Sequence, residues 1–406
     1  MKPEHFIGLD IGTSSVRCIV GMYDPNGSNG PSIIGHGSAP NQGMRRGAVV
    51  HVDDVADAIV HAVTEAERIA GVTIKRATVN VNGGHVEGIN SQGVIAISAA
   101  NREITVEDRM RVEEAATIVN LPANREIVQF FAKNYSLDGQ RNIKDPVGMH
   151  GVRLEVDAHI VTASSPNLRN LDMALEKAEV APSNHTISSL AAAEAVLTRQ
   201  QKEAGTALLD IGAGTTNLIV FEDGEVQHIA VLPIGGQHIT NDLAIGLRTD
   251  LDVAEAVKVQ HADLHTNPKK MNAMVKVGDK AYNFQFETIE LIIESRVEEL
   301  LEYVDKELHK IKRSRKLPGG IVLTGGTAKI PGIDEFARDQ LELSARIGKL
   351  QNVSGLVEAV EDASFVVPVG LMLLDMLLTP QAPAGQSKQN EGGMSGMLGN
   401  LFGRFK

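Results

Sequence analysis

The 406-residue sequence predicts an α/β protein built from two similar lobes. The first observation behind this prediction is an internal repeat, because residues 6–24 ("FIGLDIGTSSVRCIVGMYD") return in altered form at 207–224 ("ALLDIGAGTTNLIVFEDG"). Such a repeat predicts two units of related fold. The second observation is composition, since 43% hydrophobic and 22% charged residues are typical of a globular chain. A chain of this length exceeds a single core and predicts about two to four domains.

Charge and cysteine content narrow the class of protein further. A formal charge of -12 argues against nucleic acid as the main partner. Cys18 is the one cysteine, which excludes a disulfide framework and predicts a buried thiol in a reducing cytoplasm. The N-terminal segment lacks the apolar stretch of a signal peptide, so we expect none. The apolar run at 365–378 is too short to span a bilayer and predicts a buried core helix.

Each repeated segment predicts a β-hairpin whose tip binds phosphate. A buried strand ends in Asp-x-Gly, passes through small residues and continues as a second β-branched strand. Glycine lets the backbone approach an anion, and hydroxyls of Thr13, Ser14, Thr215 and Thr216 add donors. Asp10 and Asp210 are oxygen ligands suited to Mg²⁺, mostly through its water. The alternative is that both segments are ordinary tight hairpins with no ligand. That alternative would explain one Asp-x-Gly copy more easily than two matched copies.

Two further glycine elements complete a predicted nucleotide cleft between the halves. In "GIVLTGGTAKIPGIDEF" (320–336) a hydrophobic strand runs into a Gly-Gly turn and then a helix. In "PIGGQHITNDLAIGL" (233–247) Gly235 and Gly236 precede a helix start. Other nucleotide and metal motifs are excluded: there is no GxxxxGK[ST], no dinucleotide fingerprint and no HExxH. The i, i+4 pair His261 and His265 has no evident third ligand.

Taken in order, these motifs resemble the FtsA family of actin-like cell division proteins, within the actin, Hsp70 and sugar-kinase superfamily. The matching stretches cover almost the whole chain, and "DPVGMHGVRLEV" and "GGQHITND" are the most specific. The resemblance implies an actin-like fold of duplicated RNase H-like domains, with an inserted small subdomain. It implies subdomain 1A at 1–84, 165–195 and 364–380, inserted subdomain 1C at 85–164, subdomain 2A at 196–233 and 321–363, and subdomain 2B at 234–320.

Patterns inside the two small subdomains agree with this division. The stretches "GVIAIS" and "RLEVDAHIVTA" predict strands in 85–164, and "VEDRMRVEEAATIV" (106–119) predicts an amphipathic helix. Apolar residues at three- and four-residue spacing predict a long helix from Glu287 to Lys316. Its start is acidic and its end, Lys310 to Lys316, is basic, as the helix dipole favours, and Pro318 follows.

The resemblance also implies which residues bind ATP and Mg²⁺. Phosphate-loop residues carried over are Asp10, Gly12, Thr13, Ser14, Asp210, Gly212, Gly214, Thr215 and Thr216, together with Gly235 and Gly236. Gly325, Gly326 and Thr327 match the adenosine loop, and Glu255 and Lys258 match the helix that touches ribose and base. Glu194 lies near where superfamily hydrolases position an attacking water. Asn217 departs from the usual Asp, so we expect weak or slow hydrolysis at most.

The last residues predict a membrane-targeting segment. Residues 381–393 are rich in Pro, Gly, Gln and Ser and predict a flexible linker. On a helical wheel, the apolar residues of 394–406 fall within an arc of roughly 140°. The membrane-facing set is Met394, Met397, Leu398, Leu401, Phe402 and Phe405, with basic Arg404 and Lys406. A disordered sticky end or an intramolecular docking helix are the alternatives.

Two classes of function follow. The first is an ATP-dependent adaptor that polymerises at the division site on the cytoplasmic face of the cell membrane. By resemblance it binds the FtsZ C-terminal peptide through 234–320, with Lys310 to Lys316 as a candidate contact, and other division proteins through 85–164. The second is a small-molecule kinase or a pilus-assembly ATPase of the same superfamily. The predicted membrane-seeking tail favours the adaptor.

Overall fold

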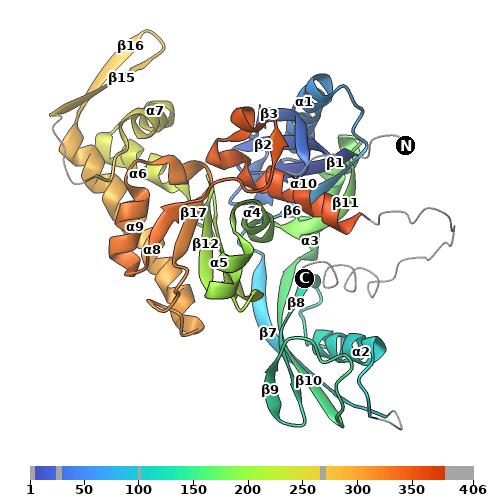
Figure 1. Cartoon of the computed structure of the whole chain (residues 1–406). Helices are drawn as coiled ribbons and strands as arrows, with labels where there is room; N and C mark the ends of the chain where they lie inside the picture. The colour runs from blue at the N-terminus through green and yellow to red at the C-terminus, as the bar shows by residue number, and fades with distance from the viewer. Residues whose placement is uncertain (1–4, 24–29, 99–101, 266–270, 380–406) are drawn as a thin grey trace.

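A computed structural model describes residues 5–23, 30–98, 102–265 and 271–379 of the chain (Figure 1). They form two lobes, each built on a mixed β-sheet, which confirms the predicted α/β fold class. The membrane-targeting segment predicted at 394–406 and its linker lie outside the described residues. No helix within the described ranges is long and apolar enough to cross a membrane.

The sheet of the first lobe has six strands in the order β11-β6-β1-β2-β3-β19. These strands are β1 (His5–Ile11), β2 (Ser15–Met22), β3 (Ser32–Pro40), β6 (Arg76–Val81), β11 (Ala181–Ile187) and β19 (Ser354–Gly355). Helices cover both faces: α1 (Val52–Ala70) packs with α3 (Ser165–Lys177), and α4 (Ser188–Val196) packs with α10 (Val366–Leu378). Glycines allow this close packing, because a β-carbon on Gly37 would lie 2.0 Å from the Ala62 carbonyl oxygen.

The apolar run at 365–378 forms the buried helix α10, as predicted. A β-carbon on Gly8 of β1 would lie 2.1 Å from the carbonyl oxygen of Pro368, so this strand and helix are in direct contact. The Asp375 carboxylate is buried beneath the sheet, where it accepts hydrogen bonds from Ile7 N at 3.0 Å and Thr78 Oγ1 at 2.7 Å. These bonds satisfy the polar group that interrupts the apolar run.

The sheet of the second lobe has five strands in the order β14-β13-β12-β17-β18. They are β12 (Thr206–Ile211), β13 (Thr216–Glu222), β14 (Glu225–Leu232), β17 (Ile321–Thr324) and β18 (Ala345–Ile347), with α5 (Arg199–Ala204) and α9 (Ile333–Leu341) beside them. The two repeated segments form equivalent antiparallel hairpins, in which Asp10 pairs with Arg17 and Asp210 with Asn217. Strand β19 lies in the segment predicted for the second lobe, yet it pairs with β3 of the first sheet.

The small subdomain predicted at 234–320 contains α6 (Gly236–Leu247), α7 (Leu251–His261), the hairpin β15 (Asn272–Val277) and β16 (Lys280–Gln285), and α8 (Phe286–Lys310). The hairpin projects away from the rest of the lobe (Figure 1). The helix predicted from Glu287 to Lys316 was wrong at its end, because α8 stops at Lys310. Lys312 and Arg315 have φ of 61° and 57°, a left-handed conformation that ends a helix.

The inserted segment forms a separate four-stranded sheet in the order β7-β10-β8-β9. Its strands are β7 (Glu87–Ala96), β8 (Arg125–Leu137), β9 (Gln140–Ile143) and β10 (Arg153–Ser164), and α2 (Val106–Thr117) covers it. Thr105 begins α2 with a capping box to Asp108. This sheet has its own hydrophobic core and extends away from the first lobe (Figure 1).

Candidate functional site

A cavity of about 320 Å³ lies between the two lobes. Thirteen of the predicted nucleotide-binding residues line it: Asp10, Gly12, Thr13, Ser14, Asp210, Gly212, Thr215, Gly236, Glu255, Lys258, Gly325, Gly326 and Thr327. They come from both hairpins, from α6 and α7, and from the turn after β17. Residues more than 300 positions apart in the sequence therefore meet at one site.

The tips of the two hairpins have the same backbone geometry and touch each other. Gly12 N donates to Ser15 O at 3.1 Å, and Gly212 N donates to Thr215 O at 2.9 Å. A β-carbon on Gly214 would lie 2.9 Å from Thr13 Oγ1. Gly214 is not among the residues that line the cavity, and its role is to let the second tip approach the first.

Three other contacts hold the second tip in place. Gly236 N donates to Gly212 O at 2.9 Å, and Gln237 N donates to Ala213 O at 2.8 Å. Thr327 Oγ1 donates to the same Gly212 O at 3.0 Å. The start of α6 therefore uses two of its free amides to fix the loop.

Gly235 and Thr216 support the loop without lining the cavity. A β-carbon on Gly235 would lie 2.5 Å from Gly212 O, so a larger residue there would displace the tip. Thr216 is fully buried and its hydroxyl donates to Ile234 O at 2.8 Å. Gly235 and Thr216 therefore help to position the second hairpin tip, although neither lines the cavity.

Asp10 and Asp210 lie buried on the cavity wall, 9% and 6% exposed. The pKa of Asp10 is raised to about 7, chiefly by burial; Arg17 opposes this shift and the nearby Asp210 carboxylate adds to it. Burial also raises the pKa of Asp210 to about 6, against a hydrogen bond from Asn217 Nδ2 at 3.0 Å. Two carboxyl groups held this way favour a bound cation, which restores their charged forms.

The donor set fits Mg²⁺ rather than a metal held by protein ligands alone. Within the described ranges, no three His, Cys, Asp or Glu side chains gather to hold a metal ion. His261 Nε2 donates a hydrogen bond to the Met274 carbonyl oxygen at 3.0 Å, and His265 pairs with Asp263. Two carboxylates beside an open cavity suit Mg²⁺, which keeps several waters and takes further oxygens from phosphate.

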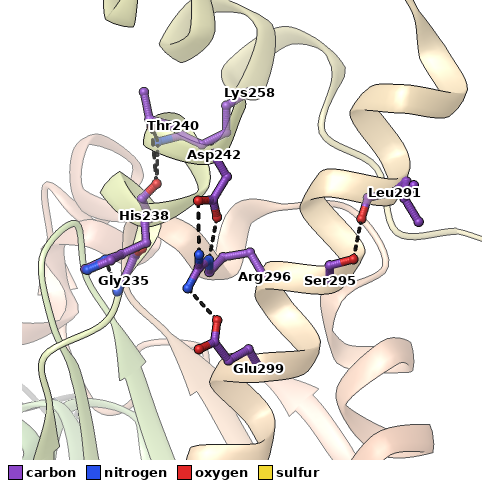
Figure 2. A network of polar contacts seen from close by, with 10 residues as sticks. Gly235, His238, Thr240, Asp242, Lys258, Leu291, Ser295, Arg296 and Glu299 are labelled. Carbon is purple, nitrogen blue, oxygen red and sulfur yellow. Dashed lines mark hydrogen bonds and ion pairs between the residues drawn. The ribbon is translucent and has the colours of Figure 1, made fainter. Parts of the chain in front are cut away.

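The other end of the cavity joins polar groups to an apolar wall. The Glu255 carboxylate accepts hydrogen bonds from Thr240 Oγ1 at 2.5 Å and Lys258 Nζ at 2.6 Å. Lys258 also donates to Thr240 Oγ1 at 2.8 Å (Figure 2). The apolar wall consists of Val259, Ala262, Ile330, Pro331 and Val367. This arrangement can bind a flat ring beside hydroxyl groups.

The sequence prediction missed several residues that line the cavity, among them Arg17, Asn82, Ser188 and Lys329. Arg17 is the cross-strand partner of Asp10, and its guanidinium lies 5.5 Å from the centre of the Phe365 ring. Strand alternation could have found it, because cross-strand partners face the same side. Asn82 had no such signal, since its contact lies on the other lobe.

Glu194, the predicted water-positioning residue, is not brought to the cavity. It does not line the cavity, and its carboxylate forms an ion pair with Lys202 Nζ of α5 at 2.6 Å. The basic residues at the end of α8 are also engaged: Lys310 pairs with Glu307, Arg313 with Glu222 and Arg315 with Glu342.

A second polar network joins α6 and α8 in the small subdomain (Figure 2). Arg296 donates to both carboxylate oxygens of Asp242, at 2.5 and 3.0 Å, and to Glu299 Oε2 at 2.5 Å. A bidentate Arg–carboxylate pair fixes geometry as well as adding energy. It therefore holds the two helices at a fixed distance beside the cavity.

The fold and site define an actin-like protein of two lobes. Among solved structures, the chain is similar to one titled "PilM-PilN type IV pilus biogenesis complex" (TM-score 0.66, 18% identity, 91% of this chain and 98% of that chain). It is also similar to MreB5 of Spiroplasma citri bound to ADP (TM-score 0.53, 16% identity, 92% and 96%). At such identities the likeness shows the fold alone.

Sequence comparison gives the family. A model described as "Cell division protein FtsA" matches residues 207–370, and one described as "SHS2 domain inserted in FTSA" matches 83–162. The chain is 37% identical to cell division protein FtsA of Bacillus subtilis, over 91% of this chain and 83% of that protein. It is 33% identical to that of Pseudomonas aeruginosa, over 98% and 93%. The chain belongs to the FtsA family of cell division proteins, as its resemblance predicted.

Proposed function

We propose that this protein is an ATP-binding polymer-forming adaptor of cell division that acts at the cytoplasmic face of the membrane. The observation that carries the proposal is the cavity between two facing Asp-x-Gly hairpin tips, with one buried carboxyl group from each lobe. The cavity has backbone turns and hydroxyl groups from both lobes, together with two carboxyl groups that can hold a cation. Such a set of groups suits a polyphosphate. The positive charges of Mg²⁺ and Arg17 would balance the negative charges of the phosphates and the two carboxylates.

ATP with Mg²⁺ is the ligand that fits this cavity best. Asp10 and Asp210 would hold the hydrated cation, while Thr13, Ser14 and Thr215 donate to phosphate. Glu255 and Lys258 would meet the ribose, and the apolar wall the base. The MreB5 structures are titled as bound to ADP and to AMPPNP, which supports a nucleotide in this fold.

Hydrolysis would be slow in this site. Asn217 cannot act as a base, and its amide donates to Asp210. The Glu194 carboxylate is paired with Lys202, away from the cavity wall. These two residues favour nucleotide-controlled assembly over rapid turnover.

Calorimetry tests nucleotide binding. Asp210→Ala removes one of the two cation-binding carboxyl groups and should weaken Mg-ATP binding by at least ~10-fold, since a charged contact is worth about 1.5–3 kcal/mol. Exposed Glu361→Gln is a matched control that should bind as the wild type does. Equal affinity of the wild type and Asp210→Ala would contradict the two-hairpin cleft.

The segment 394–406 supports membrane attachment through its sequence pattern. Its six apolar side chains contribute at most ~1.5–3 kcal/mol each, and ordering each residue costs ~1–2 kcal/mol before hydrogen bonds form. Arg404 and Lys406 add ~1 kcal/mol each on an anionic surface. A single tail would thus bind weakly, and many tails on one polymer firmly.

Electron microscopy on anionic lipid monolayers tests polymerisation. We expect filaments with ATP and few or none without it. The same chain lacking 394–406 is the control for the lipid, because it should leave the monolayer bare. Dispersed particles in every condition would refute the polymer.

The small subdomain at 234–320 is the proposed site for the FtsZ C-terminal peptide. Its helices α6 and α8 expose Ile245 (77%) and Leu291 (64%) beside the Arg296 network. Apolar anchors near an arginine suit a peptide that carries apolar and acidic residues. Amide chemical shifts on adding an FtsZ tail peptide should change in 234–320, and no change there would exclude this surface. Other division proteins would bind the inserted subdomain.

A further inference from the structure

We propose that Asn82 is a positioning residue for the nucleotide, whose side-chain amide orients the hydroxyl of Thr215 on the opposite lobe toward the phosphates. The inference rests on the proposed nucleotide binding and deepens it. Asn82 follows β6 of the first lobe, and Thr215 lies at the tip of the second hairpin. Both line the cavity.

The direction of the contact between these residues is fixed by the neighbouring backbone. Asn82 Nδ2 donates to Thr215 Oγ1 at 3.0 Å, and Asn82 Oδ1 accepts from Gly83 N at 2.7 Å. An amide rotated end for end would place its oxygen at Thr215 and its NH₂ against the Gly83 N–H. The donor end of the side chain must therefore face Thr215.

This contact leaves the Thr215 proton available to a ligand. The hydroxyl oxygen already accepts the Asn82 N–H, so its own O–H has to point elsewhere. Among the residues that the structure describes, none accepts a hydrogen bond from Thr215 Oγ1. The side chain is 2% exposed and lines the cavity, so an anion there is the natural acceptor.

The first phosphate loop is arranged in a parallel way. Thr13 Oγ1 accepts a hydrogen bond from Gly47 N at 3.0 Å, which again leaves the hydroxyl proton free to donate. Gly47 lies between the short strands β4 (Met44–Arg45) and β5 (Ala48–Val49), with φ of 76°. A β-carbon on Gly47 would lie 2.5 Å from Gly83 Cα. The Asn82–Gly83 turn thus contacts Thr215 of the second loop directly, and it contacts Gly47, which supports Thr13 of the first loop.

The contact also depends on how the lobes face each other. Asn82 and Thr215 are 133 residues apart and adjoin strands of different sheets, so the bond exists only while the two lobes lie together. A nucleotide that holds the tips together would favour this bond, and the bond would in turn favour the bound nucleotide. The chain enters β7 of the inserted sheet at Glu87, five residues beyond Asn82.

The test is calorimetry of Mg-ATP binding to the full wild-type chain and to four variants, which are two substitutions of Asn82, Thr215→Val and a double variant. Asn82→Asp keeps an oxygen for Gly83 N but replaces the donor by an acceptor, so it isolates the proposed role. The Asn82→Asp variant should bind Mg-ATP at least ~30-fold more weakly. Its carboxylate would accept the hydrogen bond of the Thr215 hydroxyl and would repel phosphate. Asn82→Ala should bind ~10-fold more weakly, the loss expected for one hydrogen bond.

A double-mutant cycle separates positioning from simple support of the turn. If Asn82 acts through the Thr215 hydroxyl, adding Asn82→Ala to Thr215→Val should cause little further loss of affinity. Losses that multiply in the double variant would overturn the proposal, as would wild-type affinity in Asn82→Asp. A wild-type chain that binds no Mg-ATP would instead overturn the proposed function itself.

Discussion

At the scale of single residues, the two buried carboxyl groups decide how the site responds to pH. The pKa is about 7 for Asp10 and about 6 for Asp210, both above the ordinary value of 3.8. Their contribution to the stability of the unliganded protein is present below pH 3.8 and is lost as pH rises through about 6 to 7. Mg²⁺ needs the charged forms, so binding must release protons.

We therefore expect Mg-ATP affinity to rise between about pH 5 and pH 8 and then level off. Asp10→Asn should weaken binding at pH 8 and flatten the upper part of this rise, since it removes the higher pKa. The same variant should melt at a higher temperature than the wild type at pH 8 without ligand. Calorimetry and thermal melts in matched ionic strength check both, and an unchanged pH profile in Asp10→Asn would contradict the assignment.

At the scale of elements, one buried histidine joins the inserted sheet to the second lobe. His159 of β10 is 1% exposed; its Nε2 accepts a hydrogen bond from Ile229 N of β14 at 3.1 Å, and its Nδ1 lies 2.9 Å from Asn90 Oδ1. Burial, with further effects of His228 and Lys133, lowers the pKa of His159 to about 3. The folded protein thus holds this imidazole in its neutral form.

This arrangement predicts acid sensitivity. The contribution of His159 to stability is present above pH 6.5, its ordinary value, and is lost as pH falls toward 3. His159→Gln can keep one acceptor and one donor, so it should reduce the loss of stability between pH 6.5 and 4. Denaturant unfolding at several pH values measures this. A variant with the same acid sensitivity as the wild type would assign the effect to other groups.

The helix α10 gives a second prediction at this scale. Asp375→Ala would leave Ile7 N and the Thr78 hydroxyl without their buried acceptor. Each of the two unpaired groups costs about 1–3 kcal/mol, so the free energy of unfolding should fall by ~2–6 kcal/mol. Glu361→Gln, on the surface before α10, is the control and should change little. Unaltered urea unfolding in Asp375→Ala would show that the bonds contribute nothing.

At the scale of the whole molecule, the two-lobed body and the proposed membrane-binding segment 394–406 are separate parts of the chain. Deleting 394–406 should abolish co-sedimentation with anionic vesicles and leave Mg-ATP affinity within about twofold of the wild type, because the two sites are separate in the chain. Vesicle co-sedimentation and calorimetry on the same preparation measure both. Retained co-sedimentation of the shortened chain would place membrane binding elsewhere.

The hairpins, the cavity residues on them and α10 were predictable because their signals are local. Asp-x-Gly followed by β-branched residues sets a turn and two strands within about a dozen positions, and its recurrence predicts the duplication. The end of α8 was not predictable in this way. The apolar spacing of a helix continues to Ile311 in the sequence. In the structure, however, Arg313 forms an ion pair with Glu222 of the second sheet, and the Ser314 hydroxyl donates to the Asp305 carboxylate.

By itself, the sequence determined the α/β class, the two repeated Asp-x-Gly hairpins and the family. These depend on patterns of adjacent residues, which reflect backbone preference and burial. Only the tertiary structure decided that Glu194 pairs with Lys202, that β19 joins the first sheet and that Asn82 reaches Thr215. Each of those depends on which distant surfaces pack together, and side-chain hydrogen bonds across 133 residues leave no periodic trace in a chain.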